Sequence, residues 1–498
     1  MTTAVIIGAG LGGLFTGAIL SKEGFQVTVL EKNKTIGGGL QTFHRFGEAF
    51  DTGMHVVGGM EHDGNIFKIC RYLGIADRVS LMPVDRACSD MLYFAEDKAA
   101  YILRNGKRDF VDSLSTYFPE ERNNIEAYVS AMFDIANGID LYNLRPSRET
   151  LPLLSDLALM SANGFIAKYV SDRRLRSVLA YINPFYGGRE DETPAYIHAL
   201  INVLYINGTQ RFVDGSSRFA DLLASIITDN GGRVIADDGV EWVEIKDRHV
   251  DFVRTKSGRQ YVGDYYISAI HPCTLFNLTD ENSFPKSYRD RLNTIPNSYS
   301  AFSLYIKMKE EAFPYINHCE YYMTRYDDIW SFGDKNKSWP LGFMMMTPPV
   351  TGQGRYSRKV LVTAPMLFDE VRRWESTAVG HRGVDYEEWK RGKARLLLKM
   401  IEDIHPGFSD AVDKINISSP LTIRDFYGVK EGAISGFSKD CRNIAYSQVP
   451  VVTKVRNLLL TGQNNRLHGF CGVPLTAINT CEAILGRNYV INRINGHE

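Results

Sequence analysis

The stretch Ala4-Val5-Ile6-Ile7-Gly8-Ala9-Gly10-Leu11-Gly12-Gly13 decides the fold of this chain. Its first four residues are an apolar run, which predicts a buried strand. The next six fit the pattern G-x-G-x-x-G. A helix is predicted over Leu14–Lys22, and Gly24 stands where such a helix would end. A second strand is predicted over Gln26–Leu30. This order of strand, glycine turn, helix and strand is the context of a dinucleotide-binding unit, whereas a glycine turn alone indicates only some α/β domain.

Each glycine of the turn has a physical task in such a unit. Gly8 permits the tight turn, Gly10 lets the backbone approach a pyrophosphate, and Gly13 lets helix and strand pack closely. The free N–H groups of the helix start attract the phosphates. Glu31 follows the second strand, 18 residues after Gly13, where a carboxylate accepts hydrogen bonds from ribose hydroxyls. An acid at this position favours FAD or NAD over NADP.

A second glycine-rich loop follows Glu31 directly. It reads Gly37-Gly38-Gly39-Leu40-Gln41-Thr42, and Phe50-Asp51-Thr52-Gly53-Met54-His55 comes soon after it. These two motifs resemble the flavoprotein superfamily that contains amine oxidases, phytoene desaturases, carotenoid cis–trans isomerases and retinol saturases. The resemblance implies that the second loop covers the pyrophosphate of FAD. Gly39 stands where the family usually has Arg, which is more similar to the retinol-saturase branch.

Further segments extend the resemblance over most of the chain. The region from His198 to Gly232 is similar to a second family segment, and Val240 matches a residue that touches adenine through its backbone. Ser419-Pro420-Leu421-Thr422 resembles a motif of carotenoid desaturases and retinol saturases. The last motif is Leu458-Leu459-Leu460-Thr461-Gly462-Gln463, which is followed by a helix that we expect to start near Pro474. The dipole of that helix would favour negative charge on a reduced flavin.

The resemblance therefore implies a set of FAD-binding residues. They are Gly8, Gly10, Leu11, Gly12, Gly13, Glu31, Lys32, Gly38, Gly39, Leu40, Thr42, Val240, Gly462, Gln463, Gly472, Val473 and Pro474.

The predicted fold class is α/β. A Rossmann-like FAD-binding domain of the glutathione-reductase type is interleaved with an α+β substrate domain that contains a mixed sheet and helices. The FAD-binding domain is predicted to comprise 1–85, 196–271 and 421–498, and the substrate-binding domain 86–195 and 272–420. Within the latter, a helix over Asp385–Ile404 has an apolar stripe that includes Tyr386, Leu396 and Leu397, which indicates core packing.

His55 is the first candidate for a catalytic group, because the resemblance places it on the flavin side of the pocket. The alternative is a structural, hydrogen-bonded histidine. His468 and Arg466 lie just before Gly472-Val473-Pro474 and could also face the flavin ring or the pyrophosphate. Tyr186 and Tyr205 are weaker candidates for groups near the ring. Cys471 is expected to be a buried, unreactive thiol. No spacing of histidines or cysteines indicates a metal site.

Composition excludes several other classes. The 498 residues contain 57 Lys and Arg against 58 Asp and Glu, a net charge of −1, which shows none of the basic excess of nucleic-acid binders. The 7 widely spaced cysteines favour a reduced, cytoplasmic protein. The sequence contains no run of about 18 apolar residues, which is the length that a membrane-spanning helix needs. The apolar segment from Leu151 to Met160, with the basic cluster Arg173-Arg174-Leu175-Arg176 beside it, suits either peripheral membrane contact or a core helix with a solvated end.

The leading hypothesis is an FAD-dependent oxidoreductase that saturates, desaturates or isomerises an apolar polyene or isoprenoid, such as a carotenoid or retinoid. Its electron donor or acceptor would be a nicotinamide, a quinone or oxygen. Two alternatives stay open. One is an FAD-dependent amine oxidase, and the other is a non-enzymatic prenyl-lipid escort protein of the same fold.

Overall fold

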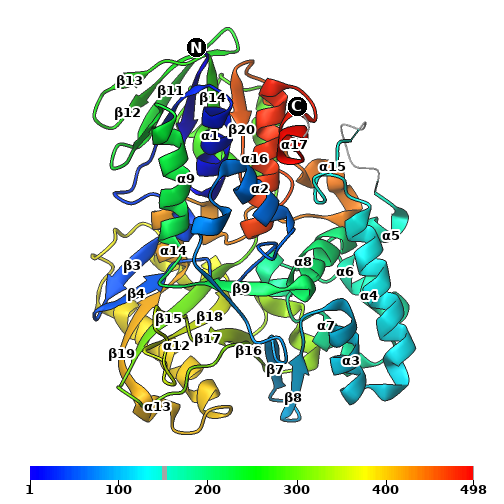
Figure 1. Cartoon of the computed structure of the whole chain (residues 1–498). Coiled ribbons are helices and arrows are strands. Elements are labelled where there is room, and N and C mark those ends of the chain that lie inside the picture. The colour runs from blue at the N-terminus through cyan, green and yellow to red at the C-terminus, as the bar shows by residue number, and fades with distance from the viewer. Residues whose placement is uncertain (148–153, 497–498) are drawn as a thin grey trace.

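A computed structural model of the protein describes residues 1–147 and 154–496 (Figure 1). Its first sheet is fully parallel and has the strand order β10-β2-β1-β14-β20. The strands are β1 (Thr3–Ile7), β2 (Gln26–Leu30), β10 (Arg233–Ile235), β14 (Tyr265–Ser268) and β20 (Leu458–Leu460). Three stretches of chain far apart in sequence therefore supply one sheet. A parallel sheet of this kind is covered on both faces, which its apolar strands require.

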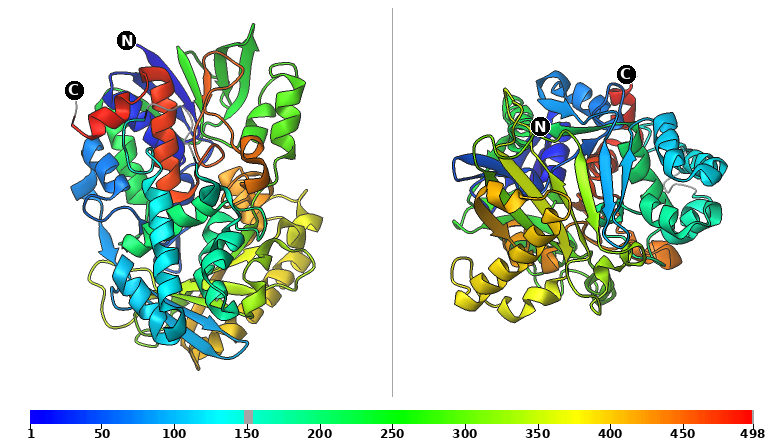
Figure 2. Two further views of the ribbon diagram at one scale, coloured as in Figure 1. Left: turned by 90° about the vertical axis from the view of Figure 1, so that its right-hand side faces the viewer. Right: turned by 90° about the horizontal axis from the view of Figure 1, so that it is seen from below.

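Alternating side chains of β1 go to different layers. Ala4 and Ile6 face the helices α1 (Leu11–Lys22), α9 (Ser217–Asp229) and α16 (Gly469–Leu485), and they belong to the main core. Val5 and Ile7 belong to a second core cluster on the opposite face. That cluster includes side chains of an antiparallel sheet formed by β11 (Val240–Lys246), β12 (His249–Thr255) and β13 (Gln260–Tyr261). The unit thus has three layers, with the helices on one side and the small sheet on the other (Figures 1 and 2).

The other large sheet is mixed and has seven strands, in the order β19-β15-β18-β17-β16-β7-β8. Only the pair β16 and β7 is parallel among these neighbours. The bounds are β7 (Asp90–Phe94), β8 (Ala99–Leu103), β15 (Ser300–Met308), β16 (Cys319–Met323), β17 (Gly342–Met346), β18 (Lys359–Met366) and β19 (Val412–Ser418). Its outer face packs on α12 (Val384–Glu402) through Leu397 and Ile401. Its inner face joins the main core through Tyr305 and Tyr321, and so lies toward the rest of the molecule.

The remaining elements connect these layers. The helices are α2 (Asn65–Leu73), α3 (Lys107–Tyr117), α4 (Arg122–Asn137), α5 (Asp156–Leu159), α6 (Ala162–Tyr169), α7 (Arg173–Leu179), α8 (Ala195–Asn207), α10 (Pro272–Phe276), α11 (Lys286–Thr294), α13 (Phe408–Ala411), α14 (Pro420–Tyr427), α15 (Ile444–Ser447) and α17 (Tyr489–Ile494). The short strands are β3 (Thr42–Arg45), β4 (Glu48–Asp51), β5 (Val57–Gly58), β6 (Leu81–Pro83) and β9 (Thr209–Phe212). Within the described part of the chain, no helix combines the length and apolarity needed to span a bilayer.

The α/β class is confirmed, and three local predictions need correction. The first helix starts at Leu11 rather than Leu14. The last long helix starts at Gly469, so that Pro474 lies inside it. Its early start has a tertiary cause, because the ring of Phe470 packs against two buried phenylalanines, one of them on α9. Leu396, expected in the buried stripe of α12, is 45% exposed.

Candidate cofactor and substrate site

The glycine turn after β1 is closed by backbone contacts. A Cβ on Gly13 would lie 2.0 Å from the carbonyl oxygen of Gly8, so only glycine lets α1 approach the turn this closely. Gly10 caps α1, and a Cβ there would meet no atom within 4 Å. The turn is therefore packed tightly on its inner side at Gly13 and open on its outer side at Gly10. This open side, beside the free N–H groups of α1, is where a pyrophosphate fits.

The second glycine loop lies directly on the first. The N–H of Gly37 donates to the carbonyl of Ala9 at 2.7 Å. A Cβ on Gly38 would lie 3.1 Å from the Cα of Gly10. Leu40 is fully buried, and its carbonyl accepts a hydrogen bond from Ser216 Oγ at 3.0 Å. Both loops thus border the same space at the N-terminus of α1.

Glu31 is buried at the end of β2 and held by the backbone. Its Oε2 accepts from the N–H of Ala9 at 2.9 Å, and its Oε1 accepts from the N–H of Asn33 at 2.9 Å. A carboxylate oxygen can accept more than one hydrogen bond, so both remain able to bind ribose hydroxyls. Val240 starts β11 close by, because Asp238 donates its N–H to the carbonyl of Glu31 at 3.0 Å.

Lys32 points away from this carboxylate. Its Nζ donates to the carbonyl of Asp425 at 2.8 Å, beside the C-terminus of α14. Burial lowers the pKa of Lys32, and the neighbouring Glu31 and Asp425 oppose that shift. Lys32 is an exposed residue whose ammonium is held by the carbonyl of Asp425, and its backbone adjoins Glu31.

The C-terminal motif meets the N-terminal turn. A Cβ on Gly12 would lie 2.8 Å from the Cα of Gly462 and 3.4 Å from a methyl carbon of Val473. The hydroxyls of Thr16 and Thr461 are 3.0 Å apart, which joins α1 to the end of β20. Two helix N-termini, those of α1 and α16, are consequently brought to one location by residues more than 440 positions apart.

The same C-terminal segment contains Gln463, Gly472 and Pro474, whose surroundings differ. A Cβ on Gly436 would lie 3.2 Å from the Cγ of Gln463. Gly472 is packed against Leu467, where a Cβ would come within 2.6 Å of a side-chain carbon. Pro474 is buried in the second turn of α16.

Thr42 and Asp51 form a structural cap. Asp51 Oδ1 accepts from both the N–H and the hydroxyl of Ser216, at 2.7 and 2.8 Å, and from Thr42 Oγ1 at 3.2 Å. Thr42 Oγ1 in turn accepts from the N–H of Ser217, the first residue of α9. The Phe-Asp-x-Gly motif thereby fastens the loop before α9 to the second glycine loop.

Gly39, at the position of the usual family arginine, lies beside Tyr427. The Tyr427 hydroxyl would be 3.8 Å from a Cβ on Gly39 and 2.5 Å from a Cβ on Gly53. Tyr427 ends α14, whose start is the Ser-Pro-Leu-Thr motif. That motif is a capping box: Ser419 Oγ accepts from the N–H of Leu421 at 3.2 Å, and Thr422 Oγ1 accepts from the N–H of Ser419 at 3.2 Å. Its contribution to the site is to position Tyr427.

Two histidines near these loops have buried ring nitrogens without a partner: His468, which is buried, and the half-buried His55. Among the described residues, His55 Nδ1 and both nitrogens of His468 have no hydrogen-bond partner. Burial lowers the pKa of His55 to about 4 and that of His468 to about 3, so both rings are neutral at pH 7. His468 is the N-cap residue of α16. Buried polar atoms without partners in a protein require a ligand or water, and those of His468 lie at the N-terminus of α16.

The other sequence candidates have protein partners. Tyr186 and Tyr128 hydrogen-bond to the two ring nitrogens of His198. Tyr205 donates its hydroxyl to the carbonyl of Val56, next to His55, at 3.1 Å. Cys471 contacts Asn65, and burial raises the pKa of its thiol to about 12, as expected for an unreactive cysteine.

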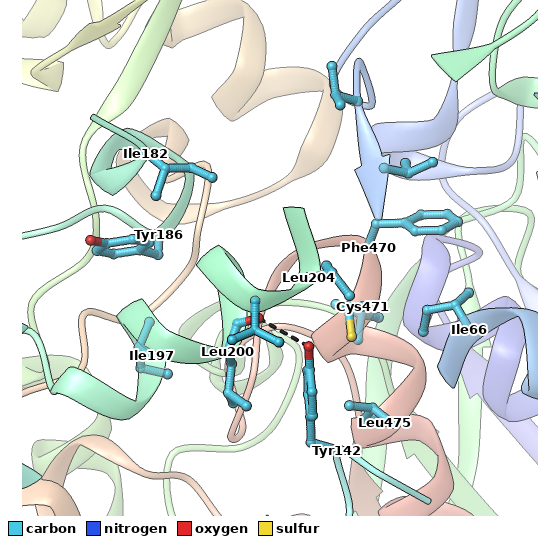
Figure 3. Packing of buried hydrophobic residues seen from close by; sticks show 14 of the residues in the cluster. Ile66, Tyr142, Ile182, Tyr186, Ile197, Leu200, Leu204, Phe470, Cys471 and Leu475 are labelled. Atoms are coloured by element: carbon cyan, nitrogen blue, oxygen red, sulfur yellow. Dashed lines mark hydrogen bonds between the residues drawn. The ribbon is translucent and has the colours of Figure 1, made fainter. Parts of the chain in front are cut away.

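An apolar cluster lies between α8 and the start of α16 (Figure 3). Leu200 and Leu204 of α8 face Phe470 and Cys471 of α16, and Tyr142 donates its hydroxyl to the carbonyl of Leu200 at 3.2 Å. The carbon-rich surroundings adjoin the site of the unpaired His468, which precedes Phe470 by two residues. These side chains pack α8 against the start of α16 and fix the position of the α16 N-terminus.

Sequence reasoning missed two groups of this region. Lys439 is buried, and its ammonium donates to the carbonyl of Asn465 at 3.1 Å. His198 is buried between its two tyrosines. A lysine in a loop is ordinarily solvated, and no local pattern marks Lys439 as different.

The basic cluster at the start of α7 is paired within the protein. Arg173 contacts Asp327 at 2.6 Å and Glu96 at 3.2 Å, and Arg174 contacts Asp97 at 3.3 Å. The preceding apolar segment lies partly outside the described residues, which resume at Leu154. For residues 1–147 and 154–496, no group of three or more His, Cys, Asp or Glu side chains is arranged to hold a metal ion.

The glycine turn, the buried carboxylate of Glu31 and the unpaired histidines form a set of groups that fits a flavin nucleotide. Comparison with known proteins agrees. Residues 11–375 match the model of the family described as flavin containing amine oxidoreductase. The chain belongs to this family, and it is an FAD-dependent oxidoreductase.

Individual proteins are similar to the chain over nearly its whole length. All-trans-retinol 13,14-reductase of Rattus norvegicus is 27% identical, and the match covers 97% of this chain and 86% of that protein. The chloroplastic prolycopene isomerase of Arabidopsis thaliana is 23% identical over 86% of this chain and 73% of that protein. The structure of cyclohexylamine oxidase from Brevibacterium oxydans has a TM-score of 0.62 at 13% identity, with all of both chains covered, which establishes a shared fold.

Proposed function

We propose that the protein is an FAD-dependent oxidoreductase of apolar polyenes, with a retinoid or carotenoid as substrate. The observation that carries this proposal is the similarity to a retinol reductase over 97% of the chain. A second relative is named as a carotenoid isomerase, so the relatives share conjugated isoprenoid substrates.

We further propose which residues hold FAD. The N-terminus of α1 with Gly10 would bind the pyrophosphate, Glu31 the adenosine ribose, and Gly462 and Gln463 the ribityl chain. When bound, FAD supplies hydride chemistry. The support for this assignment is that the loops of residues 8–13, 37–40 and 461–473 adjoin one another, with unpaired polar atoms at their junction.

His55 would then border the reacting part of the flavin. Its ring is neutral at pH 7, because burial lowers its pKa to about 4, so it would act as a hydrogen-bond donor or acceptor rather than as a charge. Tyr205 fixes the neighbouring carbonyl of Val56 and thus the path of this segment. The role proposed for His55 is to orient a substrate or the flavin.

The test is product analysis by mass. Purified protein is incubated with all-trans-retinol and with a cis-carotene, with the flavin either oxidised or reduced beforehand, with and without oxygen. A gain of two hydrogens indicates saturation, a loss indicates desaturation, and an unchanged mass with a shifted absorbance spectrum indicates isomerisation. No turnover of any polyene by protein that carries flavin would contradict the proposal. Free FAD with the same reductant is the control.

An amine oxidase is the second candidate, because the matching family model carries that description. Release of peroxide on addition of primary amines, in the absence of polyenes, would favour it. The third candidate, a prenyl-lipid escort without cofactor, conflicts with the dinucleotide geometry at Gly10 and Glu31. A flavin absorbance spectrum that purifies with the protein excludes it.

Two finer points are part of the proposal, and a third, peripheral membrane contact, is not. The electron partner would be a nicotinamide, a quinone or oxygen. The FAD-binding domain would comprise 1–85, 196–271 and 421–498, and its support is that all five strands of the parallel sheet fall within those ranges. Peripheral membrane contact finds little support at α7, where Arg173 and Arg174 are engaged with acidic side chains.

A further inference from the structure

Lys439 is a cation in the interior of the protein. It is 6% exposed, and its Nζ donates to the carbonyls of Asn465 at 3.1 Å and Ser447 at 3.3 Å. Among the described residues it makes no ion pair, since the adjacent Asp440 is bound by Arg442. Burying a charge without a counter-ion is costly, and burial accordingly lowers the pKa of Lys439 to about 7. A buried cation of this kind calls for an anion nearby.

The loop that Lys439 contacts is the one that leads to the flavin end of α16. Asn465 lies between Gly462, which touches the dinucleotide turn, and His468, the N-cap of α16. Burial is the main cause of the lowered pKa of His468, and the positive charge of Lys439 lowers it further. The two groups therefore interact electrostatically. The 436–450 segment and this loop are also joined by Phe437, whose N–H donates to Asn464 Oδ1 at 3.2 Å.

Two features therefore favour negative charge at one place: the N-terminus of the 17-residue helix α16 and the buried ammonium of Lys439. The neutral, buried ring of His468 at that N-terminus has no protein partner on either nitrogen, which leaves polar atoms for a ligand. Arg466, on the same loop, has its pKa lowered by burial as well. Glu31, the residue proposed for the adenosine ribose, follows β2, whereas α16 follows β20. These two strands lie on opposite sides of β1 in the parallel sheet. The negative charge that Lys439 would balance therefore belongs to the end of FAD that adjoins α16.

We propose that the Lys439 ammonium is the internal counter-cation for the negative charge that the flavin gains when it accepts a hydride. A hydride brings two electrons and one proton to the flavin and adds one negative charge, while Lys439 keeps its proton. Lys439 is thus a positioning residue that makes reduction of the flavin more favourable. The inference rests on FAD binding at α16 and is independent of which substrate the enzyme uses.

The test is the reduction potential of the bound flavin, measured without substrate. The flavin is reduced stepwise by dithionite in the presence of a reference dye at pH 6, below the pKa of Lys439, where the ammonium is protonated. Lys439→Gln keeps a hydrogen-bond donor but removes the charge, whereas Lys439→Arg keeps the charge. Lys454→Gln removes an exposed lysine of the same region and is the matched control. We expect the equilibrium constant for reduction to fall at least tenfold in Lys439→Gln, a shift of about 30 mV. Lys439→Arg and Lys454→Gln should stay within threefold of the unmodified protein.

An unchanged potential in Lys439→Gln overturns the proposal, because a merely structural hydrogen bond would leave the potential where it was. Should Lys439→Gln release FAD, the comparison is made on FAD retention instead. If Lys439→Arg retains FAD where Lys439→Gln loses it, the result supports a role for the positive charge. If both variants lose FAD, the result contradicts that role. The potential is measured without a polyene, so an unchanged potential in Lys439→Gln does not bear on the proposed substrate class. Conversely, an enzyme that turns over no polyene would not change the conclusion about Lys439.

Discussion

His198 shows what burial does to a single titratable residue in this protein. Its ring is inaccessible to water and lies between the hydroxyls of Tyr128 and Tyr186, with Asn202 of the same helix beside it. Burial lowers the pKa of His198 to about 3 from an ordinary value of 6.5. The neutral ring satisfies one tyrosine as a donor and the other as an acceptor, so the cluster needs no charge.

The lowered pKa predicts an acid-dependent loss of stability. The unfolded chain binds a proton at His198 below pH 6.5 and the folded protein does not, so the stabilisation present above pH 6.5 is lost progressively as the pH falls toward 3. At pH 5 the loss from this one residue is about 2 kcal/mol. Urea unfolding at pH 5, 6, 7 and 8 measures it. Compared with the unmodified protein, His198→Gln should lose less stability between pH 7 and pH 5. An equal loss in both proteins would assign the pH dependence to other groups.

Some residue roles were visible in the sequence and others were not. The positions of Gly8, Gly13 and Glu31 follow from local geometry, because a tight turn and a strand end are built within about 30 residues of chain. Lys439 and Tyr427 have no such local constraint. Their neighbours come from α15, β20 and the two glycine loops, so only the folded protein defines their surroundings.

At the scale of elements, the glycine turn and α1 divide their glycines between folding and ligand binding. Gly13 faces the inside of the turn, where the Gly8 carbonyl leaves no room for a side chain. Gly10 faces outward, where nothing in the protein restricts it. The same motif therefore contains one glycine that the fold requires and one that the cofactor would require.

Substitution of these two glycines by alanine separates the two requirements. Gly10→Ala should leave the melting temperature of the flavin-free protein within about 2 °C of the unmodified value, because its Cβ meets open space, while FAD affinity falls at least tenfold. Gly13→Ala should lower the melting temperature of the flavin-free protein strongly, since its Cβ would overlap the Gly8 carbonyl. Thermal melts of the flavin-free variants and fluorescence titration with FAD measure both effects. Normal FAD binding by Gly10→Ala would contradict the assignment of the pyrophosphate site.

Pro474 marks where element prediction by local rules fails. Proline at the first helical turn is a sound local rule, because that turn needs no N–H partners. Here α16 nevertheless extends upstream to Gly469. The aromatic contacts of Phe470 with the rings of Phe212 and Phe219 stabilise the added turn, and neither ring is near in sequence.

At the scale of the whole molecule, one site is assembled from distant parts of the chain. The N-terminal turn, the second glycine loop and the C-terminal motif meet at the starts of α1 and α16. The seven-stranded mixed sheet directs its inner face toward the same core, as the arrangement in Figures 1 and 2 shows. A ligand that contacts all three segments would stabilise them together.

FAD is therefore expected to protect three distant segments from hydrogen exchange at once. Residues 8–13, 31–40 and 461–475 should slow together when FAD is added to flavin-free protein. At 100 times its dissociation constant, FAD should add about 2.7 kcal/mol to the stability of the protein. The helix α11 (Lys286–Thr294), in which only Leu292 is buried and which lies outside the proposed contacts, serves as the internal reference. Protection confined to residues 8–13 would mean that the C-terminal motif does not contact the cofactor.

The sequence by itself determined the dinucleotide unit, the α/β class and the resemblance to flavin oxidoreductases, because glycine turns, strand ends and their spacing are local properties of the chain. The tertiary structure alone decided which side chains are buried without partners, where α16 begins, and that Lys439 and His468 lie at one place. Burial and charge compensation depend on atoms contributed by segments hundreds of residues apart, and no local pattern carries that information.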